Sequence, residues 1–215
     1  MSDARTEHSP RGRYTRGYLP HFDHRDVIQA VTFRLVDSLP EGLGGLGIDV
    51  NEFEHELNRG HGSCVLRDPE IAQLVIDALR YFDGDRYFLG PWVIMPNHVH
   101  VLVRPLADHS LGEILHSWKS FTAKKIRALI GGTGAVWQRE YFDRMIRNER
   151  HLLAATRYVH ENPVAAGLVL RAMDWPFSSV GEPAMQGMWW SRARLGVGRP
   201  EAGGPPARCR RSMRQ

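Results

Sequence analysis

Pro96–Val103 reads Pro-Asn-His-Val-His-Val-Leu-Val and carries two histidines two positions apart. Successive side chains of a strand point to opposite faces, so His98 and His100 share one face while the valines beside them share the other. The valines predict a buried back, and the histidines place two imidazoles side by side. Such a pair can bind a divalent metal or can be two ordinary polar residues, and by itself it favours neither.

The segments before this strand make it half of a hairpin. Arg86–Met95 is rich in β-branched and aromatic residues and predicts a strand, and Pro96-Asn97 predicts the tight turn that follows it. Val27–Val36 has a similar composition and predicts an earlier strand. The histidine pair is therefore expected on the second strand of a hairpin.

Three helices are predicted, at Asp68–Phe82, Ser110–Ile130 and Asn148–Glu161. Each begins at a residue type that caps helices, and the last should end before Pro163, which disfavours helical geometry in the residue before it. Shorter elements are a helix at Asn51–Leu57 within the loop Glu41–Gly62, an extended piece in Val136–Ile146 and an apolar plug at Met173–Ser179. This order predicts an α+β fold with helices packed on one face of an antiparallel sheet.

The helix at Ser110–Ile130 has two different faces. Its apolar stripe comprises Leu111, Ile114, Leu115, Trp118, Phe121, Ile126 and Leu129. The opposite face is polar and basic and comprises His116, Lys119, Ser120, Lys124 and Arg127. Such a face is either a solvated surface or a contact for phosphates. Lys125 falls within the apolar stripe, so its stem is expected to pack there while its ammonium group reaches water.

Composition limits the class of protein. At 215 residues with 42% hydrophobic residues the chain can bury one substantial core. No segment has the apolar length of a membrane span or the pattern of a signal peptide, which predicts a cytoplasmic protein without a membrane partner. Cys64 and Cys209 are the only cysteines and lie far apart, which argues against a disulfide framework and a closed zinc site. His55-Glu56 resembles the start of a zinc-protease helix, but Arg59 stands where its second histidine is required.

Charge is concentrated at the ends of the chain. The formal net charge is +4, and residues 189–215 alone contain seven arginines against Glu201. This distribution predicts an N-terminal arm at 1–18, a domain at 19–180 and a Gly, Pro and Arg-rich, flexible and disordered C-terminal tail at 181–215. Such a tail can add affinity for phosphates or can simply keep the protein soluble.

The helix at Asn148–Glu161 contributes a second set of polar residues. His151, Ala155, Tyr158 and Asn162 recur at helical spacing and form one stripe. The stripe places Tyr158 at the edge of the core. Taken alone, such a tyrosine is most often a packing residue with a hydrated hydroxyl.

Several blocks of the sequence together resemble the REP-associated tyrosine transposases, relatives of the single-strand insertion-sequence transposases of the HUH class. The blocks are Met-Pro-Asn-His98-Val-His100-Val-Leu-Val, Lys119-Ser-Phe-Thr, Trp137-Gln-Arg-Glu-Tyr-Phe-Asp, Tyr158-Val-His-Glu-Asn162-Pro-Val-Ala-Ala-Gly-Leu-Val and Asp174-Trp-Pro-Phe-Ser-Ser. They occur in the family's order between about Tyr14 and Ser179. The resemblance implies a ferredoxin-like antiparallel sheet and cleavage of single-stranded DNA beside palindromic, hairpin-forming repeats.

The resemblance also implies roles for individual residues. His98 and His100 become ligands of Mg²⁺ or Mn²⁺, Tyr158 becomes the nucleophile that forms a 5′-phosphotyrosine, and Asn162 completes the metal site. Tyr141 is the competing tyrosine. Lys119, Lys124 and Arg127 are then expected to hold the DNA backbone. The insertion-sequence relatives are dimers, so this protein is expected to be a monomer or a homodimer.

Two other functions stay open at this point. The protein could bind DNA hairpins without cutting them, since the presence of site residues does not prove turnover. It could also be a metal-dependent hydrolase of small phosphoesters that uses the same histidines. That reaction needs an acidic third ligand or base nearby, and the sequence indicates none.

Overall fold

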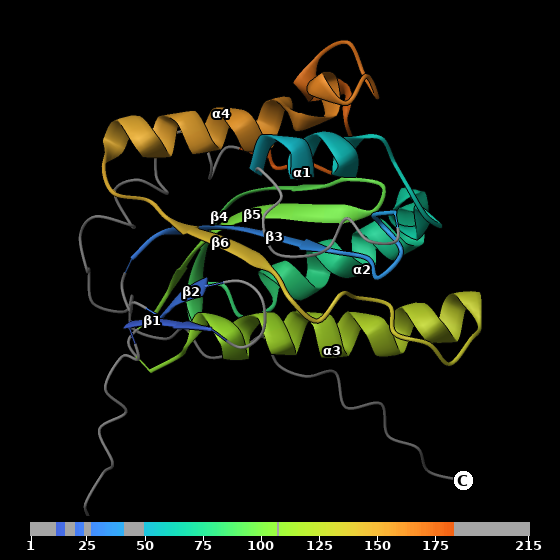
Figure 1. Cartoon of the computed structure of the whole chain (residues 1–215), viewed down its shortest axis with the longest axis horizontal. Helices are drawn as coiled ribbons and strands as arrows, with labels where there is room; N and C mark the ends of the chain where they lie inside the picture. The colour runs from blue at the N-terminus through green and yellow to red at the C-terminus, as the bar shows by residue number, and fades with distance from the viewer. Residues whose placement is uncertain (1–11, 16–19, 24–26, 41–49, 107, 183–215) are drawn as a thin grey trace, which may run out of the picture.

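The computed structural model describes residues 12–15, 20–23, 27–40, 50–106 and 108–182. Within these residues a four-stranded antiparallel sheet lies between two pairs of helices (Figure 1). Its strands are β3 (Gln29–Arg34), β4 (Tyr87–Ile94), β5 (His98–Pro105) and β6 (Phe142–Met145), in the order β4-β5-β3-β6. A separate ribbon of β1 (Gly12–Thr15) and β2 (Pro20–Asp23) lies beside β6.

The topology is ferredoxin-like, as the resemblance implied. The chain runs β3, α2 (Pro69–Arg80), β4, β5, α3 (Leu111–Ile130) and β6, which is the strand–helix–strand–strand–helix–strand order of that fold. Two helices are added to it. Helix α1 (Val50–Asn58) precedes α2, and α4 (Glu149–Ala165) follows β6. Short 3₁₀ turns occur at Val65–Arg67 and Ala172–Asp174.

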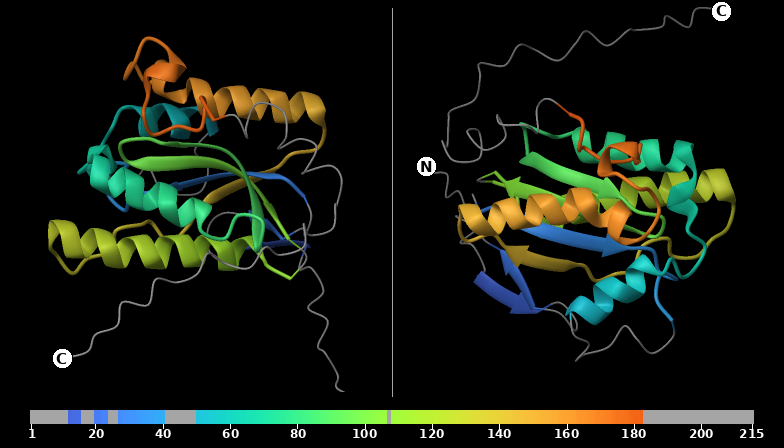
Figure 2. Two further views of the ribbon diagram at one scale, coloured as in Figure 1. Left: turned by 180° about the vertical axis from the view of Figure 1, so that it is seen from behind. Right: turned by 90° about the horizontal axis from the view of Figure 1, so that it is seen from above.

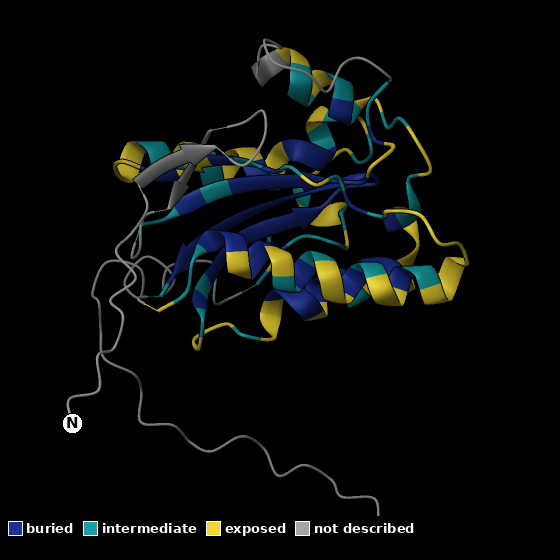
Figure 3. Cartoon of the chain, turned by 60° about the horizontal axis from the view of Figure 1, so that its bottom comes forward, coloured by how far each residue is buried: buried dark blue, intermediate teal, exposed yellow. Residues whose placement is uncertain are grey.

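Helices cover both faces of the sheet, so the expectation that they pack on one face is wrong. Helices α2 and α3 cover one face while α1 and α4 lie over the other (Figures 1 and 2). The physical reason lies in the face that carries the histidines. Leu102 of β5 and Val93 of β4 are fully buried there, together with Leu152 and Val159 of α4. An apolar surface of this kind must be covered, and the sheet interior is consequently buried on both sides (Figure 3).

Most predicted elements occur within one to three residues of their expected ends, but α4 is longer than predicted. It continues to Ala165, so Pro163 lies inside its last turns. The amide groups of Ala166 and Leu168 donate to the carbonyls of Asn162 and Pro163, which keeps the helix end bonded. Proline lacks a backbone N–H, so the helix loses one hydrogen bond, which is a modest loss so close to its end. Asn162 is therefore a helical residue one turn after Tyr158.

The apolar stripe of α3 is only partly buried. Leu111, Leu115 and Trp118 belong to the large core beneath the sheet, as predicted. Phe121 and Leu129, which were expected in the same stripe, are half exposed. Lys125 is exposed as well. Helix α3 therefore offers some apolar surface to solvent.

The segment after α4 closes the sheet edge, in agreement with the predicted plug. Trp175 donates from its indole nitrogen to the carbonyl of Ile94 at 2.9 Å, and the amide of Ser179 donates to the carbonyl of Trp92 at 3.0 Å. Among the described residues no helix has the length and hydropathy needed to span a bilayer. The predicted tail lies outside the described residues beyond Glu182, and the predicted arm is described only at β1.

A buried hydrogen-bond chain joins the two core helices to the sheet. The indole of Trp118 on α3 donates to the hydroxyl of Tyr87 at 2.9 Å, and that hydroxyl donates to the carbonyl of Leu79 on α2 at 2.7 Å. Tyr87→Phe should lower the free energy of unfolding by about 1–2 kcal/mol, because it leaves a buried donor without a partner. Urea denaturation measures this loss. Tyr81→Phe is the matched control, since Tyr81 is 71% exposed and should tolerate the change.

Candidate functional site

Glu54, His98 and His100 form a cluster of possible metal ligands on the face covered by α1 and α4. One ligand atom from each lies within 4.8 Å of the other two. The Nε2 atoms of the two histidines are 3.0 Å apart, and Nε2 of His100 is 3.5 Å from Oε2 of Glu54. Two imidazole nitrogens and one carboxylate form a donor set that suits a divalent cation. The cluster thus fits the metal that the resemblance implied.

Both histidines are buried rather than at the surface, and each is oriented by a neighbour. Oδ1 of Asn97 lies 2.7 Å from Nδ1 of His98, while the amide group of Asn97 donates to the carbonyl of His61. Oγ1 of Thr32 lies 2.8 Å from Nδ1 of His100. With the Nδ1 atoms engaged, the Nε2 lone pairs point toward the cluster.

Burial also controls the charge of the two rings. Desolvation lowers the pKa of His98 well below its ordinary value, and the nearby His100 lowers it further. Desolvation likewise lowers the pKa of His100, although the carboxylate of Glu54 opposes that shift. Neutral imidazoles are the form that binds metals. The fold therefore holds both rings in the ligand form.

Thr32→Val should weaken metal binding without unfolding the protein. Valine matches the shape of threonine but cannot hold the Nδ1 atom of His100, so the ring loses its fixed orientation. Loss of such an outer contact lowers metal affinity about 10-fold to 100-fold. Titration calorimetry with Mn²⁺ measures the change. Thr122→Val is a control, since Thr122 is buried on α3 against Trp118 and Trp137, and its variant should bind Mn²⁺ as the parent does.

Glu54 is a candidate acidic ligand that no sequence motif indicates. It lies on α1, within the helix predicted at Asn51–Leu57, and reaches the histidines across 44 residues of sequence. Leu57 of the same helix is fully buried, and Phe53 packs under the guanidinium of Arg34 at 5.9 Å. These contacts hold α1 over the ends of β3 and β5. The only available signal was the helix itself, since Glu54 belongs to no motif.

Tyr158 lies beside this cluster. Its hydroxyl donates to Oε2 of Glu54 at 2.5 Å, and its ring meets the ring of His100 edge to face at 5.2 Å between centroids. Tyr158 remains 43% exposed, so a substrate can reach it. Burial of the hydroxyl end and the adjacent Glu54 carboxylate raise the pKa of Tyr158 above its ordinary value. The structure thus brings Tyr158 to the histidine pair from α4.

Asn162 lies one helical turn beyond Tyr158 and is buried. Neither Oδ1 nor Nδ2 of its side chain makes a hydrogen bond of ordinary length and angle. An unpartnered buried amide is costly, so its atoms are available for a ligand or a water. A hydrogen-bonding interaction from Asn162 lowers the pKa of Tyr158, against the larger effects of burial and Glu54. It therefore belongs to the surroundings of the cluster, although Glu54 is the residue grouped with the histidines.

Tyr141, the competing tyrosine, lies on the other side of the sheet. It belongs to the large core with Phe33, Trp118 and Trp137, beneath the sheet. The histidine face is separated from it by the full thickness of the sheet. Of Tyr141 and Tyr158, the fold therefore places Tyr158 beside His98 and His100.

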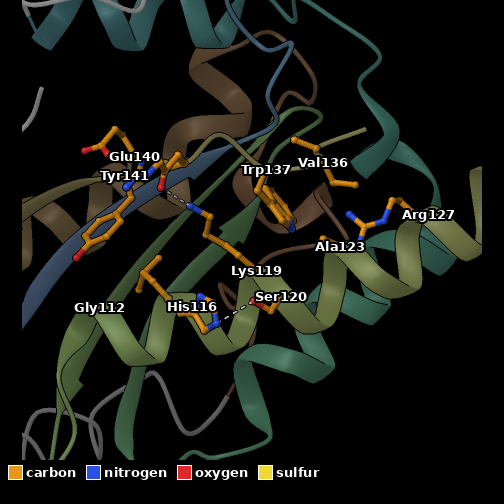
Figure 4. A pocket seen from close by; sticks show the side chains of 13 residues that line it. Gly112, His116, Lys119, Ser120, Ala123, Arg127, Val136, Trp137, Glu140 and Tyr141 are labelled. Atoms are coloured by element: carbon orange, nitrogen blue, oxygen red, sulfur yellow. Dashed lines mark hydrogen bonds between the residues drawn. The ribbon is translucent and has the colours of Figure 1, made fainter. Parts of the chain in front are cut away.

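The basic face of α3 lines a groove on the side of the sheet away from the histidines (Figure 4). The groove has a volume of about 510 Å³, and its walls include His116, Lys119, Ser120 and Arg127. The ammonium group of Lys119 donates to the carbonyls of Gln138 and Arg139 at 2.6 and 2.8 Å. Partial burial lowers the pKa of Lys119 to about 8. Lys119 therefore ties α3 to the segment after it, while Lys124 on the next turn is exposed.

A family model described as transposase IS200 like matches residues 80–162. The matched segment contains His98, His100, Tyr158 and Asn162, which belong to the Glu54 cluster or lie beside it. The chain is therefore similar to the IS200-like transposases over this segment, which is less than half of its length. Glu54 lies outside the matched segment.

Two curated relatives are similar to part of this chain. The chain is 27% identical over 119 residues to the REP-associated tyrosine transposase of Escherichia coli (strain K12), covering 54% of this chain and 69% of that protein. It is 31% identical over 97 residues to a candidate REP-associated tyrosine transposase of Haemophilus influenzae, covering 40% of this chain and 54% of that one. The fold also matches a solved REP-associated tyrosine transposase bound to a REP hairpin, with a TM-score of 0.53 and 21% identity over 89% of this chain and 91% of that chain.

Proposed function

We propose that this protein is a tyrosine transposase that cleaves and rejoins single-stranded DNA beside REP-like, palindromic hairpins through a 5′-phosphotyrosine on Tyr158. One observation supports this most directly. The carboxylate oxygen of Glu54 that accepts the Tyr158 hydroxyl is the same oxygen that lies 3.5 Å from His100. A nucleophile and a candidate metal site that share one carboxylate oxygen can act on one phosphate.

The proposed reaction exchanges one phosphodiester bond for another. The hydroxyl oxygen of Tyr158 attacks the scissile phosphorus, the bond from phosphorus to the 3′ oxygen breaks, and the phenol proton is balanced by the proton gained at the new 3′-hydroxyl. The 5′ phosphate stays on Tyr158 and preserves the energy for rejoining. A free tyrosine is a weak nucleophile because its pKa is near 10. Glu54, hydrogen-bonded to the hydroxyl, orients the oxygen toward the site.

The residues proposed to hold Mg²⁺ or Mn²⁺ are His98, His100 and Glu54, with Asn162 as a further oxygen donor. Bound there, such a cation would supply charge neutralisation at the phosphate and would favour the phenolate of Tyr158. Asn97 and Thr32 keep the imidazoles in place. The buried, unpartnered amide of Asn162 is consistent with a ligand at that position.

A single-stranded hairpin oligonucleotide with a 5′ label on its flank tests the proposal. Incubation with Mn²⁺ should yield a shortened labelled strand with a free 3′-hydroxyl and a covalent complex between the protein and the unlabelled remainder. Peptide mapping should place the DNA on Tyr158. Binding without either product would support the hairpin-binding protein that does not cut DNA.

The alternative function, a metal-dependent hydrolase of small phosphoesters, requires an acidic group near the histidines, and Glu54 supplies one. It predicts release of free products and no covalent complex. A generic phosphodiester such as bis-p-nitrophenyl phosphate separates the two functions, since a hydrolase would cleave it at an unchanged rate after Tyr158→Phe. The proposed transposase would not.

Lys119, Lys124 and Arg127 are proposed to hold the DNA backbone along α3, with Lys119 acting mainly by shaping the groove. Lys124→Ala and Arg127→Ala should each weaken hairpin binding at low salt and reduce the slope of log K against log salt by about 1. Fluorescence anisotropy across a salt series measures both. Lys125→Ala removes the same charge from another face of α3 and should leave the slope unchanged.

We propose a monomer or homodimer that acts on DNA in the cytoplasm. The boundaries 1–18, 19–180 and 181–215 are proposed as arm, transposase domain and tail, with the basic tail contributing to DNA affinity. Size-exclusion chromatography with light scattering tests the oligomeric state directly.

A further inference from the structure

An apolar groove lies between α2 and α3 on the side away from the sheet. It has a volume of about 360 Å³. The residues that line it are Asp77, Ala78, Tyr81, Phe82, Ser117, Trp118 and Phe121. Tyr81 is 71% exposed and Phe121 is 49% exposed, so two large rings stand at its rim without cover from the described residues. Adjacent exposed aromatic rings of this kind mark a contact surface.

The described chain ends close to this groove. Glu182, its last residue, forms an ion pair with Arg80 at the end of α2, next to Tyr81 in the sequence. The preceding turn is fixed, because the amide of Glu182 donates to the carbonyl of Ser179 and the amide of Ser179 donates to Trp92 on β4. The guanidinium of Arg80 also stacks over the ring of Trp92 at 5.4 Å. The next residues therefore leave from a defined point beside α2.

The sequence that follows is the apolar part of an otherwise basic tail. Residues 183–190 read Pro-Ala-Met-Gln-Gly-Met-Trp-Trp, with two methionines and two tryptophans within six positions. From Ser191 onward the tail contains seven arginines and no aromatic residue. Crossing the outer surface of α2, about 10 Å wide, takes roughly three extended residues. Met185–Trp190 is thus the first segment that can reach the groove, and it has the matching chemistry.

We propose that Met185–Trp190 of the same chain docks in the groove between α2 and α3. The methionine and tryptophan side chains cover Tyr81 and Phe121, and arginines such as Arg192 then emerge near Asp77 on the rim. Docking also fixes the point at which the basic end of the tail begins. That point lies on the same side of the sheet as the α3 groove that Lys119 and Arg127 line. The inference does not depend on the cleavage reaction.

Thiol labelling in the full chain tests the docking. In a Cys64→Ser, Cys209→Ser background, Ser117→Cys places one thiol inside the groove with little change in size. The additional pair Trp189→Ser, Trp190→Ser should raise its labelling rate by a maleimide about fivefold or more, because the cover is lost. The matched control is Ser120→Cys on another face of α3, whose rate should not change. Equal rates at Ser117→Cys with and without the tryptophans would overturn the proposal.

A crosslink identifies the occupant. A benzophenone attached to Ser117→Cys should capture a peptide from residues 183–194 of the same chain, as read by mass spectrometry of a mixture of light and heavy isotope-labelled protein. A crosslink between light and heavy chains, or protection that disappears on dilution, would show a second copy in the groove and overturn the proposal. Circular dichroism melts of each variant confirm that labelling reports cover rather than unfolding.

Discussion

Tyr158→Phe is expected to abolish the covalent protein–DNA complex and to reduce cleavage of a hairpin substrate by about 10³-fold or more. The substitution removes one oxygen, which is the attacking atom of the proposed reaction. The phenyl ring keeps its edge-to-face contact with His100, so the neighbouring side chains should not move. The measurement is a denaturing gel of the adduct after incubation with Mn²⁺.

A measurement of Mn²⁺ affinity distinguishes loss of the nucleophile from loss of the metal site. The Tyr158→Phe protein should bind Mn²⁺ at least as well as the parent, because the Glu54 carboxylate no longer accepts the tyrosine hydroxyl. Tyr141→Phe is the matched control. Tyr141 lies beneath the sheet, so its variant should form the adduct within a few-fold of the parent rate. Adduct formation by Tyr158→Phe would exclude Tyr158 as the nucleophile.

Glu54→Gln is expected to lower the affinity for Mn²⁺ by about 100-fold, near 2.7 kcal/mol, and to reduce cleavage in parallel. Glutamine keeps the length and can still bond the hydroxyl of Tyr158, but it lacks the negative charge that a hard divalent cation prefers. Titration calorimetry measures the affinity. The double variant His98→Ala, His100→Ala gives the lower reference, at which Mn²⁺ binding should be undetectable.

Asn162→Ala tests which residue is the third metal ligand. The family pattern indicates Asn162, whereas the fold brings Glu54 nearest to the histidines. A neutral amide contributes less to binding a divalent cation than a carboxylate, so this variant should lose only about tenfold in affinity. An unchanged affinity after Glu54→Gln, combined with a large loss after Asn162→Ala, would transfer the third ligand from Glu54 to Asn162. Glu54 would then serve only to position Tyr158.

The strands and helices of the core could be predicted because their signals are local. The alternation in His98–Val103, the capping residues Ser110 and Glu113 and the Asp68-Pro69 start each reflect backbone chemistry within a few residues. All of them occur where expected. Pro163 is the exception, because a local preference was outweighed by the bonding of the residues that follow it.

The second helical layer could not be predicted from these signals. The histidine face of β5 carries Leu102 between polar residues, and on a strand such a mixture is compatible with water as well as with burial. Only the assembled sheet shows that Leu102, Val93 and Met95 form one apolar surface that α4 must cover. The partial exposure of Phe121 has the same origin, since burial depends on what packs against a helix and not on its own periodicity.

The sequence by itself determined the pieces of the candidate site that lie in local patterns: His98 and His100 on one face of a strand, and Tyr158 and Asn162 on one stripe of a helix. The tertiary structure alone decided that Glu54 joins the histidines, and it places Tyr158, the tyrosine that the family resemblance favours over Tyr141, beside them. The reason is physical. Periodicity fixes which side chains of one element share a face, whereas a site built from α1, β5 and α4 requires three elements to meet, and their meeting is set by the packing of the whole core.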